Sequence, residues 1–168
     1  MKKVVTFGEV MVRLAPSEHD RFAQSCPGTM DLTFGGAESS VAASISMLGG
    51  SSRFVSALPQ HAIADAFVRQ MRGFKVDVDH VLRREAGRFG IYYVETGANQ
   101  RPSRVIYDRD YSAVSICSGE EYDWDAIFAD AQWLHISGIT LAISETAAHA
   151  AILAAGKAQA AGVKVSCD

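Results

Sequence analysis

Residues 34–50 read FGGAESSVAASISMLGG, in which one glycine pair opens a run of small residues and a second pair closes it. The pattern predicts a turn from a strand into a helix at Gly35 and Gly36. Glycine has no Cβ atom, so a ligand can approach its backbone closely, and the first N–H groups of a helix have no partner inside the helix. The turn is therefore a candidate ligand-binding site. The alternative is a plain strand-to-helix connection, because an isolated glycine motif has little specificity.

Strand and helix signals alternate along the remaining chain, which is typical of an α/β fold with a mostly parallel sheet. Apolar runs predict strands at residues 3–7, 10–14, 32–34, 54–58, 132–136 and 163–167. Helices are predicted after residue 36, over 63–73 and over 145–161. In the first helix, the spacing of Val41, Ile45 and Leu48 predicts one buried apolar face. In the last, we expect Ser144 to cap the helix and Gly162 to end it.

Residues 89–109 predict a β-hairpin, because aromatic and β-branched runs flank the turn residues 97–99. A hairpin inserted into an alternating α/β chain often lies over the ligand. Tyr92 and Tyr93 point to opposite faces of their strand, so only one of them can face a ligand. The alternative role for Tyr92 is packing within the hairpin.

The composition is that of an ordinary globular chain of 168 residues, with 48% hydrophobic residues and a net charge of −3. No basic stripe is present, which argues against a nucleic-acid partner. No apolar run approaches the roughly 20 residues that span a bilayer, and no signal peptide is recognisable, so we expect a cytoplasmic protein without a membrane partner. Cys26, Cys117 and Cys167 are far apart, which favours reduced thiols over disulfides or a metal site.

Other motifs of cofactor chemistry are missing from the sequence. The acidic residues 120–125 are interpreted as a solvated loop rather than a metal site, and the histidines have no metal-binding spacing. There is no Walker A or Gly-x-Gly-x-x-Gly motif, so cofactor-binding residues stay unknown and no metal ligand is assigned.

A series of motifs nevertheless occurs in order along the chain. They are Gly8-Glu9-Val10-Met11, Gly35-Gly36-Ala37-Glu38-x-x-Val41-Ala42 with Leu48-Gly49, Val55-x-Ala57-Leu58-Pro59, Gly73-Phe74-Lys75-Val76-Asp77, Arg104 to Ala113, and Leu134 to Ile139. Together they resemble the amino-terminal half of the ribokinase-like (PfkB) carbohydrate kinases, and among these the 2-keto-3-deoxygluconate kinases most. The resemblance covers nearly the whole chain.

The resemblance implies a ribokinase-like, doubly wound and mostly parallel sheet with helices on both faces and a small β-sheet lid. Residues 1–168 would be the amino-terminal part of this α/β domain, with lid strands around 10–34 and 89–109. It also implies an ATP- and Mg²⁺-dependent transfer of the γ-phosphoryl group to a hydroxyl of 2-keto-3-deoxygluconate or a related sugar. Fructose, ribose or another sugar is the alternative substrate.

For the substrate site, the resemblance implies contacts from six residues: Gly35, Gly36, Ser40, Tyr92, Tyr107 and Arg109. A guanidinium can give a sugar carboxylate two parallel, charge-assisted hydrogen bonds, and a tyrosine combines an apolar ring with a hydroxyl. The alternative for Arg109 is a surface ion pair with Asp108 or Asp110. Ser40 stands where the family usually has Asn, and it supplies one hydroxyl in place of an amide, so one of the sugar contacts that an Asn makes is expected to be lost.

The family's Gly-Ala-Gly-Asp motif, which supplies the general base and the anion hole, does not occur in this chain. We therefore expect the chain to be truncated, to contain no catalytic residue and to be inactive alone. The alternative from another class is a non-catalytic sugar-binding or dimerisation module. Because a small two-stranded piece is marginal by itself, we also expect a homodimer that buries residues 89–107 of the lid.

Overall fold

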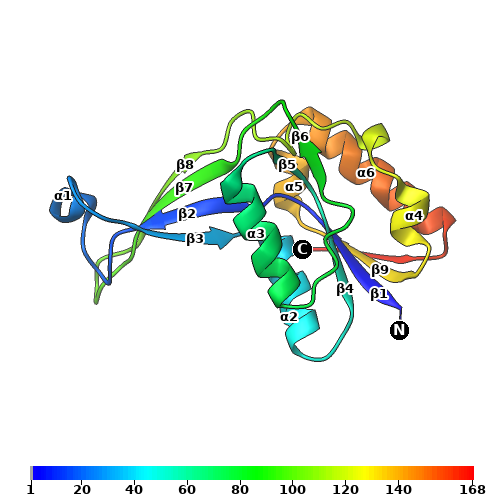
Figure 1. Cartoon of the computed structure of the whole chain (residues 1–168), viewed down its shortest axis with the longest axis horizontal. Helices are drawn as coiled ribbons and strands as arrows, with labels where there is room; N and C mark the ends of the chain where they lie inside the picture. Colours follow the sequence, from blue (N-terminus) through cyan, green and yellow to red (C-terminus); the bar gives the residue numbers. More distant parts are fainter. Residues whose placement is uncertain (1) are drawn as a thin grey trace.

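The computed structural model describes residues 2–168, which form a parallel β-sheet with helices and a second, smaller sheet that extends away from them (Figure 1). The larger sheet has four strands in the order β10-β9-β1-β4. These strands are β1 (Lys3–Phe7), β4 (Ser52–Val55), β9 (Ala131–Ile136) and β10 (Lys164–Cys167). All of its pairings are parallel, as the alternating sequence pattern predicts.

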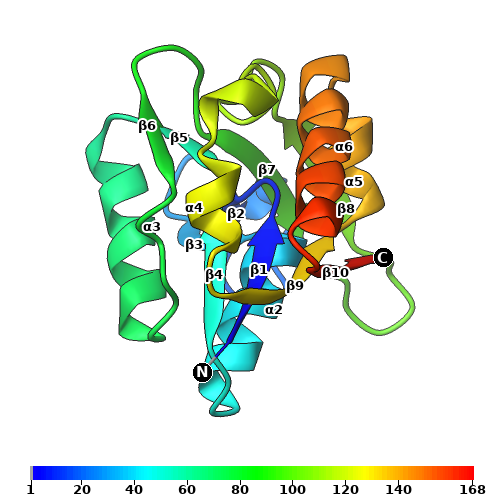
Figure 2. The ribbon, with the colours of Figure 1, turned by 90° about the vertical axis from the view of Figure 1, so that its right-hand side faces the viewer.

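Helices cover both faces of the parallel sheet (Figure 2). On one face lie α4 (Trp124–Phe128) and α6 (Glu145–Ala160), and on the other lie α2 (Ala37–Met47) and α3 (Ala62–Gly73). Neighbouring strand residues therefore enter different cores, since Val55 belongs to the first cluster and Phe54 to the second. This arrangement confirms the doubly wound α/β architecture.

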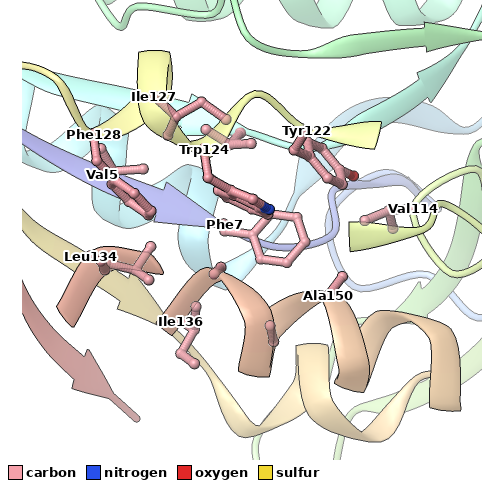
Figure 3. Packing of buried hydrophobic residues seen from close by; sticks show 14 of the residues in the cluster. Val5, Phe7, Val114, Tyr122, Trp124, Ile127, Phe128, Leu134, Ile136 and Ala150 are labelled. Carbon is pink, nitrogen blue, oxygen red and sulfur yellow. The ribbon is translucent and has the colours of Figure 1, made fainter. Parts of the chain in front are cut away.

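Aromatic residues fill the first core above the end of β1 (Figure 3). The Phe7 ring is fully buried, and its centroid lies 5.3 Å from that of Tyr122 and 5.4 Å from that of Trp124, both edge-on. The Trp124 indole N–H donates to the Gly119 carbonyl at 2.7 Å, so its polar atom is satisfied inside the core. This packing holds β1 firmly just before the chain leaves the parallel sheet.

The smaller sheet has the strand order β3-β2-β7-β8, with β2 (Met11–Ala15), β3 (Asp31–Gly35), β7 (Gly90–Glu95) and β8 (Arg104–Asp108). The pairs β2–β3 and β7–β8 are antiparallel, whereas β2 and β7 are parallel. The short α1 (Phe22–Ser25) lies at the far end of this sheet (Figure 1). The predicted hairpin is thus present, and residues 10–34 supply its partner strands.

Short elements complete the fold. They are the parallel pair β5 (Ala57–Pro59) and β6 (Leu82–Arg84), the 3₁₀ turn η1 (Gly119–Glu121) and α5 (Gly138–Ala142). Around α6 the sequence prediction is confirmed at both ends: Ser144 Oγ accepts from the Ala147 N–H at 2.9 Å, and Gly162 has a φ of +72°.

The predicted apolar face of α2 is only partly buried: Val41 and Ile45 are half-buried, but Leu48 is not. Leu48 is 88% exposed, and the buried residues of the helix are Glu38, Ser39 and Ala42. Leu48 is the C-cap residue, outside the regular helix, so the helical spacing does not carry it onto the sheet. The face of α2 that packs inward is set by polar contacts at its first turn, described below.

An ion-pair network lies at the amino-terminal ends of the strands of the parallel sheet. Arg53 Nε donates to Asp77 Oδ2 at 2.8 Å, and Lys3 Nζ lies 3.0 Å from Asp77 and 2.8 Å from Asp130. Burial alone would raise the pKa of Asp77, but hydrogen bonds from the Asp79 backbone, Lys3 and Arg53 hold that pKa at about 2. The charged form of Asp77 is therefore favoured in the folded protein.

We expect Asp77→Asn to lower the free energy of unfolding at neutral pH by about 2 kcal/mol, since a depressed carboxyl pKa stabilises the fold while the group is ionised. The difference in unfolding free energy between wild type and variant should be present above about pH 4 and be lost as the pH falls towards the folded-state pKa of about 2. Urea unfolding of the full-length gene product at several pH values measures this difference. Asp79→Asn is the control, because the Asp79 side chain is 79% exposed and should change little. Equal effects of the two substitutions would contradict the prediction.

Candidate functional site

The candidate site lies where several strands end. Residues 8–10 follow β1, Ser137 follows β9, and Gly36 joins β3 to α2. In open α/β sheets, ligands bind outside the carboxyl ends of the strands. The smaller sheet leaves the body of the molecule at the same place, so its residues can contribute to the same site (Figure 1).

A buried carboxylate fixes the start of α2. Glu38 is 1% exposed, and its Oε1 accepts from the Ser137 N–H at 3.0 Å, the Ser137 hydroxyl at 2.6 Å and the Thr140 hydroxyl at 2.7 Å. Gly8 makes room for this carboxylate, because a Cβ on Gly8 would lie 2.2 Å from the Glu38 Cδ. The first turn of α2 is therefore tied to the end of β9.

Both glycines of the turn lie against neighbouring groups that leave no space for a side chain. A Cβ on Gly36 would lie 2.4 Å from the Glu9 carbonyl oxygen, and a Cβ on Gly35 would lie 2.2 Å from the Tyr92 hydroxyl. Gly36 is the N-cap of α2 and has no side chain to accept from the first helical N–H groups. The turn thus combines close packing with helix N–H groups that lack a side-chain cap.

The strand register places the predicted lid residues on one face of the smaller sheet. Tyr92 pairs with Tyr107, their ring centroids are 6.1 Å apart, and the Arg109 Cζ lies 5.6 Å from the Tyr107 centroid. Gly35 lies on the same face, since it neighbours Met11 of β2 in register. Tyr93 faces the other way, as expected, and its ring lies near that of Phe22. Burial raises the pKa of Tyr92 above its ordinary value, which favours the neutral hydroxyl.

Arg109 makes neither of the surface pairs that were its alternative. Its Nη2 donates to Glu9 Oε2, whereas Asp108 pairs with Arg88. Glu9 is 4% exposed; burial raises the pKa of this carboxyl, and the Ser112 hydroxyl and the Arg109 guanidinium counteract that rise. Within residues 2–168, Glu9 Oε1 and Arg109 Nε are buried without a hydrogen-bond partner.

Ser40 is separate from this group. It lies in the first turn of α2, is exposed, and its hydroxyl has no hydrogen-bond partner in the described part of the chain. Its assignment to the substrate site depends only on the family resemblance.

Sequence reasoning missed three charged residues here: Glu9, Glu38 and Arg13. Arg13 neighbours Tyr92 in the β2–β7 register, which puts it on the face that carries Tyr107 and Arg109, and it has no ion pair among residues 2–168. The alternation of strand residues indicates that Arg13 and Met11 share a face, but only the sheet order shows that this is the tyrosine face. Nothing in the local sequence indicates that Glu9 and Glu38 are buried.

Two further kinds of feature are absent from the described residues. Residues 2–168 contain no group of three or more His, Cys, Asp or Glu side chains placed to hold a metal ion. None of their helices has both the length and the apolar character needed to cross a bilayer.

Comparison with known proteins identifies the class. The model of the pfkB family carbohydrate kinases matches residues 1–168, so the chain belongs to this family. A 2-dehydro-3-deoxygalactonokinase of Haloferax volcanii is 38% identical over 144 residues, which are 86% of this chain and 44% of the relative. A fructokinase of Salmonella typhimurium is 29% identical over 170 residues, covering 99% of this chain and 50% of the relative.

Among solved structures, the 2-dehydro-3-deoxygluconokinase of Thermotoga maritima matches with a TM-score of 0.94 and 43% identity. The match covers 100% of this chain and 51% of that protein. The chain thus spans about half the length of the relatives it matches.

We expect Gly35→Ala to push Tyr92 out of place, because the new Cβ would lie 2.2 Å from its hydroxyl oxygen. Overpacking of this kind typically costs about 1 to 3 kcal/mol. The cost should be smaller in a Tyr92→Phe background, where the nearest ring atom is the Cζ at 3.1 Å. Urea unfolding of the two single variants and the double variant of the full-length gene product measures the coupling. Additive effects would show that the Tyr92 hydroxyl does not face Gly35.

Proposed function

We propose that the full-length protein is a sugar-acid kinase that transfers the γ-phosphoryl group of ATP, with Mg²⁺, to a hydroxyl of 2-keto-3-deoxygluconate or a close relative of it. The observation that carries the proposal is the place of Arg109: a partly buried guanidinium on the tyrosine face, paired with Glu9, whose backbone packs against Gly36 of the glycine turn. Such a guanidinium suits a carboxylate better than a neutral hydroxyl.

The tyrosine face and the start of α2 supply the other sugar contacts that we propose. Tyr92 and Tyr107 would offer ring surface and hydroxyls to the sugar, and the helix N–H groups beyond Gly36 would donate to its oxygens. Arg13 adds a second guanidinium to this face. Unlike Arg109, Arg13 has no ion pair in residues 2–168. Arg13 and Arg109 thus place two cations on the tyrosine face, and only Arg109 has an ion pair among residues 2–168, which favours an anionic ligand.

ATP would supply the phosphoryl group and Mg²⁺ would balance its charge. The donor set in residues 2–168 does not fit the metal, since no three His, Cys, Asp or Glu side chains are placed to hold one, and we assign no residue of this chain to either group. The residues described here would instead bind and orient the sugar and exclude water from it.

A fructokinase is the second candidate, because a fructokinase relative aligns with 99% of this chain. The other alternative, a non-catalytic sugar-binding module, predicts sugar binding without ATP consumption. A panel of acid and neutral sugars, assayed with ATP and the full-length gene product, separates the three.

In that enzyme, we expect Arg109→Ala to raise KM for the acid sugar by about tenfold to hundredfold, since hydrogen bonds between charged groups contribute about 1.5 to 3 kcal/mol. KM for a neutral sugar should change little. Arg104→Ala is the matched control, because Arg104 is exposed on the opposite face of the same strand. Unchanged kinetics for the acid sugar in Arg109→Ala would remove the basis of the proposal.

We further propose that the smaller sheet is a lid and that two lids pack together in a homodimer. The face opposite Tyr92 is apolar at its far end, where Phe22, Met30, Tyr93 and Ile106 line a hollow of about 360 Å³. Ile106 is 53% exposed and borders this apolar hollow, and a contiguous exposed apolar patch is typical of a protein–protein contact.

Ile106→Glu should therefore convert the full-length protein from a dimer to a monomer, because it would bury a charge without a partner in the interface. Val105→Glu, on the tyrosine face of the same strand, should leave the dimer intact. Light scattering at micromolar concentration measures both. A wild-type protein that is monomeric under these conditions contradicts the dimer.

A further inference from the structure

The pair between Glu9 and Arg109 joins two segments that are 100 residues apart in the chain. Glu9 lies in the connection after β1, and Arg109 directly follows β8 at the edge of the smaller sheet. The Glu9 side chain is 3% exposed and the Arg109 side chain 22% exposed. The guanidinium is therefore partly open to solvent, whereas the carboxylate that it pairs with is not.

The surroundings leave room for this pair. A Cβ on Gly90 would lie 3.3 Å from Glu9 Oε1 and 3.4 Å from the Arg109 Cβ, so the absence of a side chain at position 90 keeps the space between them free. On its other side, the guanidinium lies over the Tyr107 ring, with Cζ 5.6 Å from the centroid. The carboxylate and the ring together hold the planar group in one place.

We infer that Glu9 is a positioning residue, which holds the Arg109 guanidinium in the orientation that receives the carboxylate of the sugar acid; the inference rests on the proposed function. A free arginine side chain has many rotamers, and fixing it before the ligand arrives lowers the cost of binding. A guanidinium has five N–H donors, so the bond to Glu9 Oε2 leaves others for a ligand.

The test uses Glu9→Gln in the full-length enzyme, which keeps the shape of the side chain and removes its charge. We expect KM for the acid sugar to rise by about three- to tenfold, with a smaller change in kcat. Glu95→Gln is the matched control, because Glu95 is also buried, at 7% exposure, but lies at the far end of the same sheet and accepts from the Phe22 N–H. A fall in KM after Glu9→Gln would mean that Glu9 competes with the substrate, and would overturn the inference.

A double-mutant cycle separates positioning from a general structural role. If Glu9 acts through Arg109, Glu9→Gln should have no further effect on KM in the Arg109→Ala background, whereas a structural defect would add to it. Glu9→Asp keeps the charge but shortens the side chain, and it should also raise KM for the acid sugar. This variant replaces Glu9→Gln in the test if Glu9→Gln does not fold. Additive effects in the cycle would overturn the inference.

A crystal structure of full-length Glu9→Gln provides a readout that needs no substrate. We expect the Arg109 guanidinium to leave the Tyr107 ring. An unchanged Arg109 would overturn the inference even if the enzyme used sugar acids. A displaced Arg109 in an enzyme that used only neutral sugars would support the positioning role and refute the proposed substrate.

Discussion

The buried carboxylate of Glu38 is the constraint on which the rest of the site depends. Burying a carboxylate is costly unless donors surround it, and here three hydrogen bonds from Ser137 and Thr140 reach one oxygen at the positive end of α2. These bonds fix how α2 sits against β9, and Gly8 must lack a side chain for the carboxylate to fit. This anchor therefore positions the glycine turn, the strand β3 that precedes it, and the sheet that carries the tyrosine face.

Much of the fold could be predicted because its signals are local. Short apolar runs, the hairpin turn chemistry and the caps at Ser144 and Gly162 each depend on a few neighbouring residues, and the structure has them. The family resemblance likewise named Tyr92, Tyr107 and Arg109, which the register brings to one face. Their role in binding stays a prediction.

The parts that were missed depend on contacts between distant segments. Leu48 has helical spacing but lies beyond the end of its helix, where no sheet covers it. Whether Arg13 shares a face with Tyr92 depends on β2 lying beside β7, a pairing between strands some eighty residues apart, which no local pattern reveals. The pairing of Glu9 could not be predicted from local sequence either, because its partner Arg109 lies 100 positions away.

The connection between β1 and β2 is only residues 8–10, yet the two strands belong to different sheets. β1 is an interior strand of the parallel sheet, with β9 on one side and β4 on the other, and the rings of Tyr122 and Trp124 flank its last residue, Phe7. A tether this short has almost no slack, so the smaller sheet is not a flap on a flexible arm. A change in the tilt of the smaller sheet would therefore have to change the backbone torsions of residues 8–10, directly beside a strand that is hydrogen-bonded on both sides.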